Sequence, residues 1–201
     1  MMDLSLKRIL AFSIDILLVT LVATLLTRIL PIDPYVDKYQ DVYEKYTEFS
    51  KENQKGTVDQ DQLMNYTHDI YYYRVVSSAV SVGLLILYFG VLQMVWHGQT
   101  VGKKIFKIQL VSNNDKKLHF GNYLIRVIIL NNILFTVLSD VLVFVLDVKP
   151  FYYVAYVLSL ISSTIYVANI LMIILKSDNR GLHDILAGTK VVDLKSLPVE
   201  N

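Results

Sequence analysis

The chain has 201 residues, 54% of them hydrophobic, and its mean hydropathy of +0.44 exceeds that of an ordinary soluble domain. A net charge of +1 gives no indication of nucleic-acid binding, and the absence of cysteine excludes disulfides and thiolate chemistry. Four long apolar blocks follow one another, at 9–30, 75–95, 124–146 and 152–175. Each reaches the roughly 20 residues that a helix needs to cross a hydrocarbon core. The sequence therefore predicts an all-α membrane protein, built as a four-transmembrane-helix bundle.

The first span carries a carboxylate, Asp15, about two turns inside an otherwise apolar run. A charge at that depth costs roughly 2.5–3.5 kcal/mol on insertion scales, unless a partner or a watery cavity relieves it. Arg8 lies seven residues earlier and therefore on nearly the same helix face. Other candidate partners are Arg126, Arg180 and His183. Two interpretations stay open: a buried ion pair that fixes helix packing, and a cation or proton site.

The connection at 31–74 is the longest between two spans, and it carries a pattern of its own. Within residues 35–49, tyrosines and a phenylalanine recur at intervals of three and four, with acids and lysines between them. This spacing predicts an amphipathic helix in the outer loop. Its Tyr-rich face suits an aromatic or sugar ligand, but packing against the bundle or at the membrane interface is the simpler interpretation.

The connection at 97–123 contains a short strand-like run, 107–111, that ends at a turn-prone Asn-Asn-Asp sequence. The tail, 176–201, has a matching run at 189–192 after a glycine. We therefore expect a small cytoplasmic β element. Gly98-x-x-x-Gly102-Lys103 lacks the full spacing of a phosphate-binding loop, so nucleotide binding is not predicted.

Basic residues near the span ends predict the orientation, because they resist translocation. The N-terminus, the 97–123 connection and the 176–201 tail are rich in lysine and arginine, whereas 31–74 has five basic and nine acidic residues. We expect a multi-pass protein of the cell membrane, with 31–74 as an extracytoplasmic insert and both termini in the cytoplasm.

The tail places Arg180, His183 and Asp184 within one predicted helical turn, with Arg180 and Asp184 at the i,i+4 spacing that lets side chains meet. A histidine beside a carboxylate titrates near neutral pH, which suits a proton relay. Alternatively, Asp184 pairs with a basic residue of 98–107 and pins the tail under the bundle, which is the interpretation we favour. The four histidines lack zinc-ligand spacing, and no catalytic constellation is present, so we expect no metal, no cofactor and no enzyme activity.

Three separated motifs resemble the RDD family of prokaryotic membrane proteins: RILAFSID at 8–15, GQTVGKKIFKIQLV at 98–111 and RGLHDILAGTKVV at 180–192. The resemblance implies that 1–201 forms a single RDD-type membrane domain. It also implies that the arginine and the two aspartates for which the family is named correspond to Arg8, Asp15 and Asp184. The enlarged 31–74 loop departs from the family, so no ligand specificity is implied there.

The resemblance implies a role in transport, with cation/proton antiport for some members. Two classes of function follow. The first is a transporter of a small solute or a monovalent cation coupled to protons, with Asp15 at its centre. Four spans are few for alternating access, so this interpretation favours a homo-oligomer. The second is a non-enzymatic membrane adaptor that regulates a partner membrane protein.

Overall fold

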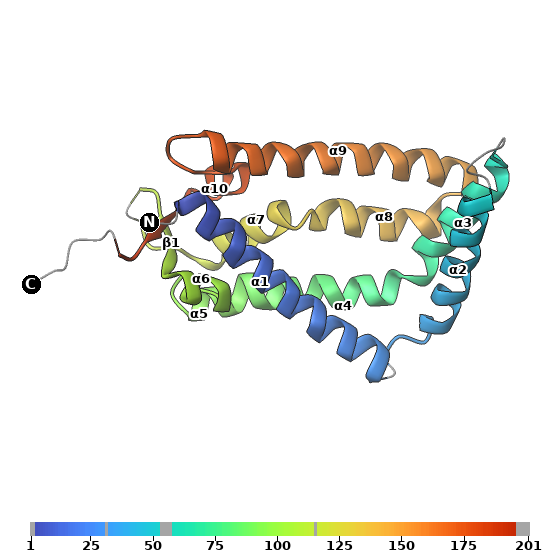
Figure 1. The fold of residues 1–201 in the computed structure, drawn as a ribbon, viewed down its shortest axis with the longest axis horizontal. Helices are drawn as coiled ribbons and strands as arrows, with labels where there is room; N and C mark the ends of the chain where they lie inside the picture. The colour runs from blue at the N-terminus through green and yellow to red at the C-terminus, as the bar shows by residue number, and fades with distance from the viewer. Residues whose placement is uncertain (1–2, 31, 53–57, 115, 196–201) are drawn as a thin grey trace, which may run out of the picture. The chain divides into compact units, whose positions relative to one another are not determined.

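The computed structural model describes residues 3–30, 32–52, 58–114 and 116–195, which are mostly helical (Figure 1). Three helical segments are long and apolar enough to cross a membrane: Leu4–Ile29, Val75–Val95 and Val148–Leu175. The elements in chain order are α1 (Leu4–Thr24), a π-helical turn (Leu25–Ile29), α2 (Val36–Glu52), α3 (Gln60–Tyr73), α4 (Val75–Leu85), a second π-helical segment (Ile86–Leu92), α5 (Gln93–Val95), α6 (Val101–Phe106), β1 (Ile108–Ser112), α7 (Phe120–Leu130), α8 (Ile133–Val145), α9 (Val148–Leu175), α10 (Leu182–Leu186) and β2 (Thr189–Asp193). The all-α membrane class with a small β element is therefore confirmed.

The predicted third span, 124–146, is not one continuous helix. It divides into α7 and α8, which are bent by 66° at a break. The break falls at Asn131 and Asn132, and Asn132 adopts a left-handed conformation with φ of 52°. Asparagine tolerates this region better than most residues, whereas a regular helix cannot contain it. The described chain thus has three candidate spans, or four if the bent pair is one span.

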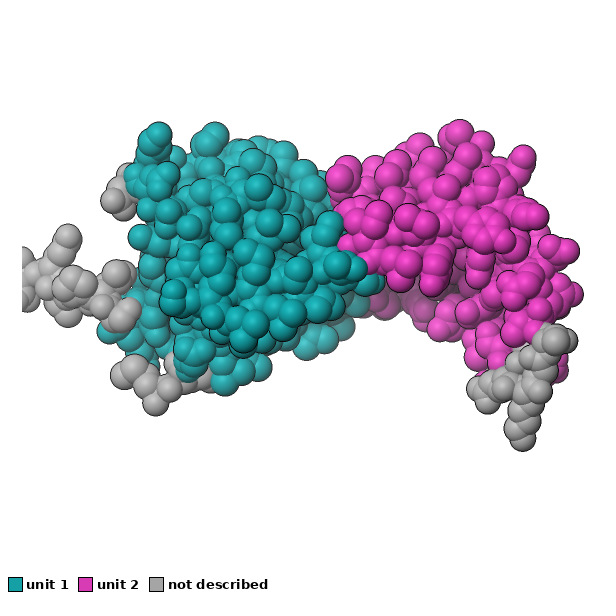
Figure 2. All heavy atoms as spheres, turned by 90° about the horizontal axis from the view of Figure 1, so that it is seen from above, with its two compact units in different colours: residues 1–22, 82–133, 163–201 teal, residues 23–81, 134–162 magenta. Residues whose placement is uncertain are grey.

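The chain divides into two compact units, which Figure 2 colours separately. Unit 1 spans residues 1–22, 82–133 and 163–201, and unit 2 spans residues 23–81 and 134–162.

In unit 1, β1 and β2 pair as an antiparallel two-stranded sheet, with Ile108 opposite Asp193 and Ser112 opposite Thr189. The predicted runs at 107–111 and 189–192 are therefore confirmed to within one residue. Ile108 and Leu110 alternate toward a core that also contains Ala11 of α1 and Tyr123 of α7. Figure 1 shows the beginning of α1 beside this sheet and α10. The sheet closes the end of unit 1 at which the chain begins.

Helix α6 packs directly on α1 at a glycine. Thr100 caps the start of α6, and its hydroxyl accepts the backbone N–H of Lys103 at 3.3 Å. Gly102 lies so close to α1 that an added Cβ would collide with the backbone carbonyl of Ala11. Only glycine permits this approach.

Replacing Gly102 with alanine is therefore expected to separate α6 from α1 and to destabilise the protein by about 1–3 kcal/mol. Gly83→Ala is the matched control, because a Cβ at Gly83 of α4 meets nothing within 4 Å. Alanine is the better helix former, so this control should leave stability unchanged or raise it by up to about 1 kcal/mol. Thermal unfolding of the purified variants in detergent measures both effects. Equal stability of the two variants would contradict the close contact.

In unit 2, α2 confirms the amphipathic helix predicted for the outer loop. Its aromatic side chains pack against α3, with the rings of Phe49 and Tyr66 5.6 Å apart. Tyr35, just before α2, contacts Tyr73 in the same way at 5.9 Å. These contacts match the simpler interpretation, in which the tyrosines pack within the protein. Residues 31 and 53–57 of the insert lie outside the described residues.

Candidate functional site

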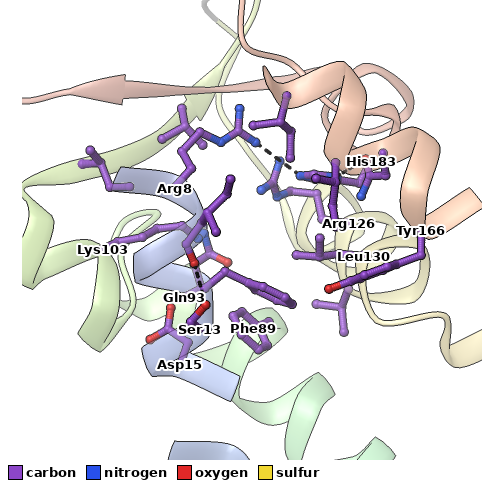
Figure 3. A pocket seen from close by; sticks show the side chains of 18 residues that line it. Arg8, Ser13, Asp15, Phe89, Gln93, Lys103, Arg126, Leu130, Tyr166 and His183 are labelled. Carbon is purple, nitrogen blue, oxygen red and sulfur yellow. Dashed lines mark hydrogen bonds between the residues drawn. The ribbon is translucent and has the colours of Figure 1, made fainter. Parts of the chain in front are cut away.

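A cavity of about 140 Å³ lies within unit 1, and we call it the unit 1 cavity (Figure 3). Its walls come from α1, the π-helical segment at Ile86–Leu92, α5, α6, β1, α7, α9, α10 and β2. Most lining side chains are apolar. The polar or charged ones on which its chemistry depends are Arg8, Asp15, Lys103, Arg126, Asn169 and His183. Four of the six predicted site residues therefore line one cavity: Arg8, Asp15, Arg126 and His183.

Asp184 joins two of these basic residues into a buried cluster. Arg8 Nη2 lies 2.5 Å from its Oδ2, and Arg126 Nη1 donates to its Oδ1. The backbone N–H of Gly181 adds a hydrogen bond of 3.0 Å to Oδ2. Asp184 is fully buried. Burial favours the neutral acid, but the charges of Arg126 and Arg8 hold the pKa of Asp184 well below its ordinary value.

This cluster ties three elements together, because Arg8 belongs to α1, Arg126 to α7 and Asp184 to α10. The pinning role favoured for Asp184 agrees with this geometry. Its predicted partner was wrong, since no basic residue of 98–107 makes an ion pair with Asp184 in the described chain. Figure 3 shows Arg8, Arg126 and His183 pointing toward one another at one side of the cavity.

His183 lies beside the cluster, but its contacts do not suit a relay near neutral pH. Its Nδ1 lies 2.7 Å from Oδ1 of the buried Asn169, so a neutral ring carries its proton on Nδ1. Nε2 then accepts from Arg8 Nη2 at 3.4 Å. Burial, followed by the charge of Arg126, lowers the pKa of His183 well below 6.5. This lowered pKa argues against the predicted titration near neutral pH, although the Asp184 carboxylate, 3.3 Å from Nε2, acts in the opposite direction.

Arg180 does not meet the Asp184 carboxylate, contrary to the predicted i,i+4 contact. Helix α10 begins at Leu182, so Arg180 precedes it. Its Nε donates to the backbone carbonyl of Thr189 at 3.0 Å, and its Nη2 lies 3.4 Å from the backbone carbonyl of Asp184. Arg180 thus supports the tail through backbone groups.

Asp15 is 1% exposed, and three donors surround it. Its Oδ2 accepts the Thr100 hydroxyl at 2.5 Å. Its Oδ1 accepts the Tyr88 hydroxyl at 2.5 Å and the Gly102 N–H at 2.8 Å. None of the predicted basic partners contacts it among the described residues, and Figure 3 places it away from the arginines. Asp15 therefore attaches the start of α6 to α1, which favours the packing role over a cation site.

Lys103 is a residue that the sequence reasoning missed. It lies on α6, lines the unit 1 cavity and is only 9% exposed. Within the described part of the chain its Nζ makes no hydrogen bond and no ion pair. Burial lowers the pKa of Lys103 to about 7, and the positive charge of Arg126 acts in the same direction.

The only indication of Lys103 in the sequence is the Gly-Lys-Lys run at 102–104 of the second motif. That run does not show which of its two lysines points toward the interior. Lys104 lies instead over the ring of Trp96, 3.5 Å from its centroid. The two side chains diverge because successive residues of a helix are about 100° apart.

The lining of the unit 1 cavity is more basic than acidic. Arg8, Lys103 and Arg126 contribute positive charge, and the one acid that lines it, Asp15, has both oxygens occupied by hydrogen bonds. Across the described ranges, no three His, Asp or Glu side chains are grouped as metal ligands. The cavity therefore suits a small anion, or the anionic end of a solute, better than a bare cation.

A family model agrees with the motifs: the model of the RDD family matches residues 5–188. The matched range contains Arg8, Asp15, Lys103, Arg126 and Asp184. No curated protein and no solved structure matches the chain.

Proposed function

The chain belongs to the RDD family, and from this premise we propose that it is a membrane transporter that couples the movement of a small solute to protons. The unit 1 cavity holds the solute, and Lys103 takes up and releases the proton. One observation carries the proposal: the buried amine of Lys103, on α6 outside the candidate spans, lines a cavity whose other walls include α1 and α9, and within the described chain it makes no ion pair. Buried ionisable groups that line a cavity are candidates for substrate and proton binding.

Electrostatics supports an anionic solute. Arg8 and Arg126 share the single carboxylate of Asp184, so a protonated Lys103 leaves the cavity with an excess of positive charge. An anion in the cavity stabilises the protonated amine, and loss of the proton weakens the hold on the anion. The proton and the anion therefore move together. A monovalent cation has less support, because it would face three basic side chains.

The proposal also covers the orientation of the chain in the membrane and its assembly into an oligomer. The distribution of lysine and arginine supports a cell-membrane protein with both termini in the cytoplasm. Three or four spans are few for alternating access, so a homo-oligomer forms the transport unit. If the protein moves no solute, the alternative is a non-enzymatic adaptor that regulates a partner membrane protein.

Lys103→Met tests the assigned role. Wild-type protein in liposomes that contain a pH-sensitive dye is expected to move protons when phosphate, sulfate or chloride is supplied, with a change in rate near pH 7. Lys103→Met should lower this flux at least tenfold, because methionine fills the same space and cannot bind a proton. Lys104→Met is the matched control and should keep most of the flux, since Lys104 is exposed. To test the cation alternative, sodium gluconate or potassium gluconate is supplied instead, and proton movement is measured in the same way.

Stability provides a second readout of the same group. The pKa of Lys103 is about 7 in the folded state and 10.5 as the ordinary value, so between these values the unfolded chain binds more protons. Wild-type stability should rise as the pH increases from 7 toward 10, and Lys103→Met should reduce that rise. Wild-type vesicles without flux, or unchanged flux in Lys103→Met, would contradict the proposal.

A further inference from the structure

A second cavity, of about 420 Å³, lies within unit 2, and we call it the unit 2 pocket. It is formed by the end of the first span, the start of α2, the start of α4 and one residue of α8. Nine of its ten lining side chains carry a polar atom, and the exception is Val36. Polar groups on membrane helices are costly, so their concentration around one cavity indicates a purpose beyond packing.

Four hydroxyls of the pocket already donate their protons within the protein. Because each has donated, its oxygen keeps lone pairs that can accept an N–H or O–H from a ligand. The four bonds run from Thr27 to the Ala23 carbonyl at 2.9 Å, from Ser81 to the Ser77 carbonyl at 2.8 Å, from Ser78 to Asp140 Oδ2 at 2.5 Å and from Ser77 to Asp33 Oδ2.

Two guanidinium groups line the same pocket, those of Arg28 and Arg74. Neither makes a hydrogen bond within the described residues. Arg74 lies over the Tyr71 ring, 3.7 Å from its centroid, and its Nη2 is 3.7 Å from Asp140 Oδ1, which is too far for a hydrogen bond. Arg74 Nε and Asp140 Oδ1 are buried without a hydrogen-bond partner in the described chain. Such atoms are rare in folded proteins and call for an explanation.

The opposite charge is fixed in place. Asp33 is 6% exposed, and its carboxylate accepts the Tyr35 N–H at 2.9 Å as well as the Ser77 hydroxyl. The pocket therefore presents unused guanidinium donors together with a buried carboxylate and hydroxyl acceptors.

We propose that the unit 2 pocket binds a small oxyanion, a carboxylate or a phosphate, that also bears hydroxyl or ammonium donors. The planar guanidinium matches an oxyanion through paired N–H donors. The hydroxyl oxygens and the negative charge of Asp33 receive the donor groups of the same ligand. A simple anion would contact only the two arginines, and a simple amine would contact only Asp33 and the hydroxyl oxygens. Neither would use both halves of the pocket. The site shares no residue with the unit 1 cavity, so it does not depend on the proposed function.

The test is calorimetric titration of the purified full chain in detergent at pH 7. Serine carries a carboxylate, an ammonium group and a hydroxyl, and glycerol 3-phosphate carries a phosphate and hydroxyls. At least one of these should bind saturably and at least tenfold more tightly than acetate, inorganic phosphate or ethanolamine, which each lack one half of the chemistry. The comparison of serine with glycerol 3-phosphate distinguishes the carboxylate from the phosphate.

Arg28→Gln and Arg74→Gln should each weaken this binding at least tenfold. Arg28 is exposed, so its variant should fold even if the Arg74 variant does not. Lys45→Gln is the matched control, because Lys45 lies on α2 of the same unit and pairs with Asp41 in an exposed contact outside the pocket. Absence of saturable binding by either probe, or binding that both arginine variants retain, would overturn the proposal.

Discussion

Asp184→Asn is expected to destabilise the protein by about 3–5 kcal/mol, because it leaves Arg8 and Arg126 buried without their shared counter-charge. Folded yield and thermal unfolding in detergent measure the loss. Asp178→Asn is the matched control, since Asp178 is exposed and its ion pairs measure 3.7 and 4.0 Å. That change should cost less than about 1 kcal/mol.

A double-mutant cycle and the pH dependence isolate the charge effect of Asp184. Combining Asp184→Asn with Arg126→Gln should cost less than the sum of the single changes, because one unpaired charge is removed with its partner. The folded-state pKa of Asp184 lies below its ordinary value of 3.8, so its contribution is complete above that value and is lost as the pH falls further. Asp184→Asn should therefore flatten the loss of stability below about pH 4. Additive single effects would contradict a coupled cluster.

Asp15→Ala is expected to destabilise the protein by about 3 kcal/mol, because it leaves up to three donors without their acceptor at about 1–3 kcal/mol for each that stays unpaired. The hydroxyls of Thr100 and Tyr88 can rotate toward other acceptors, whereas the N–H of Gly102 cannot. Asp15→Asn keeps one oxygen for that N–H and should cost clearly less. Unfolding in detergent measures the series, with Ser13→Ala, an exposed change on the same helix, as the control.

The same series separates the two interpretations of Asp15. If its role is attachment of α6, then flux in liposomes should follow stability, and Asp15→Asn should retain most of both. Loss of flux in Asp15→Asn at unchanged stability would instead favour an ion site at Asp15 and contradict the packing role.

Features that depend on neighbouring residues could be predicted from the sequence. The apolar lengths predicted four spans, three of which are continuous helical segments long enough to cross a membrane; the spacing of tyrosines predicted α2, and the short runs beside glycines predicted the two strands. The bend at Asn131 and Asn132 was missed, because both flanking segments are apolar and hydropathy does not register a backbone that turns left-handed.

The sequence by itself determined which polar residues stand out, but only the tertiary structure decided how they pair. Arg8 and Asp15 share a helix face, yet Arg8 pairs with Asp184, 176 positions away. Asp15 instead receives the hydroxyl of Tyr88 and the hydroxyl and N–H of Thr100 and Gly102, from two other segments. Spacing along one helix limits which neighbours can meet, whereas pairing across the fold depends on how close two elements approach. That approach is set by packing, here by Gly102 against the backbone of Ala11, which also turns Lys103 toward the cavity and Lys104 toward Trp96.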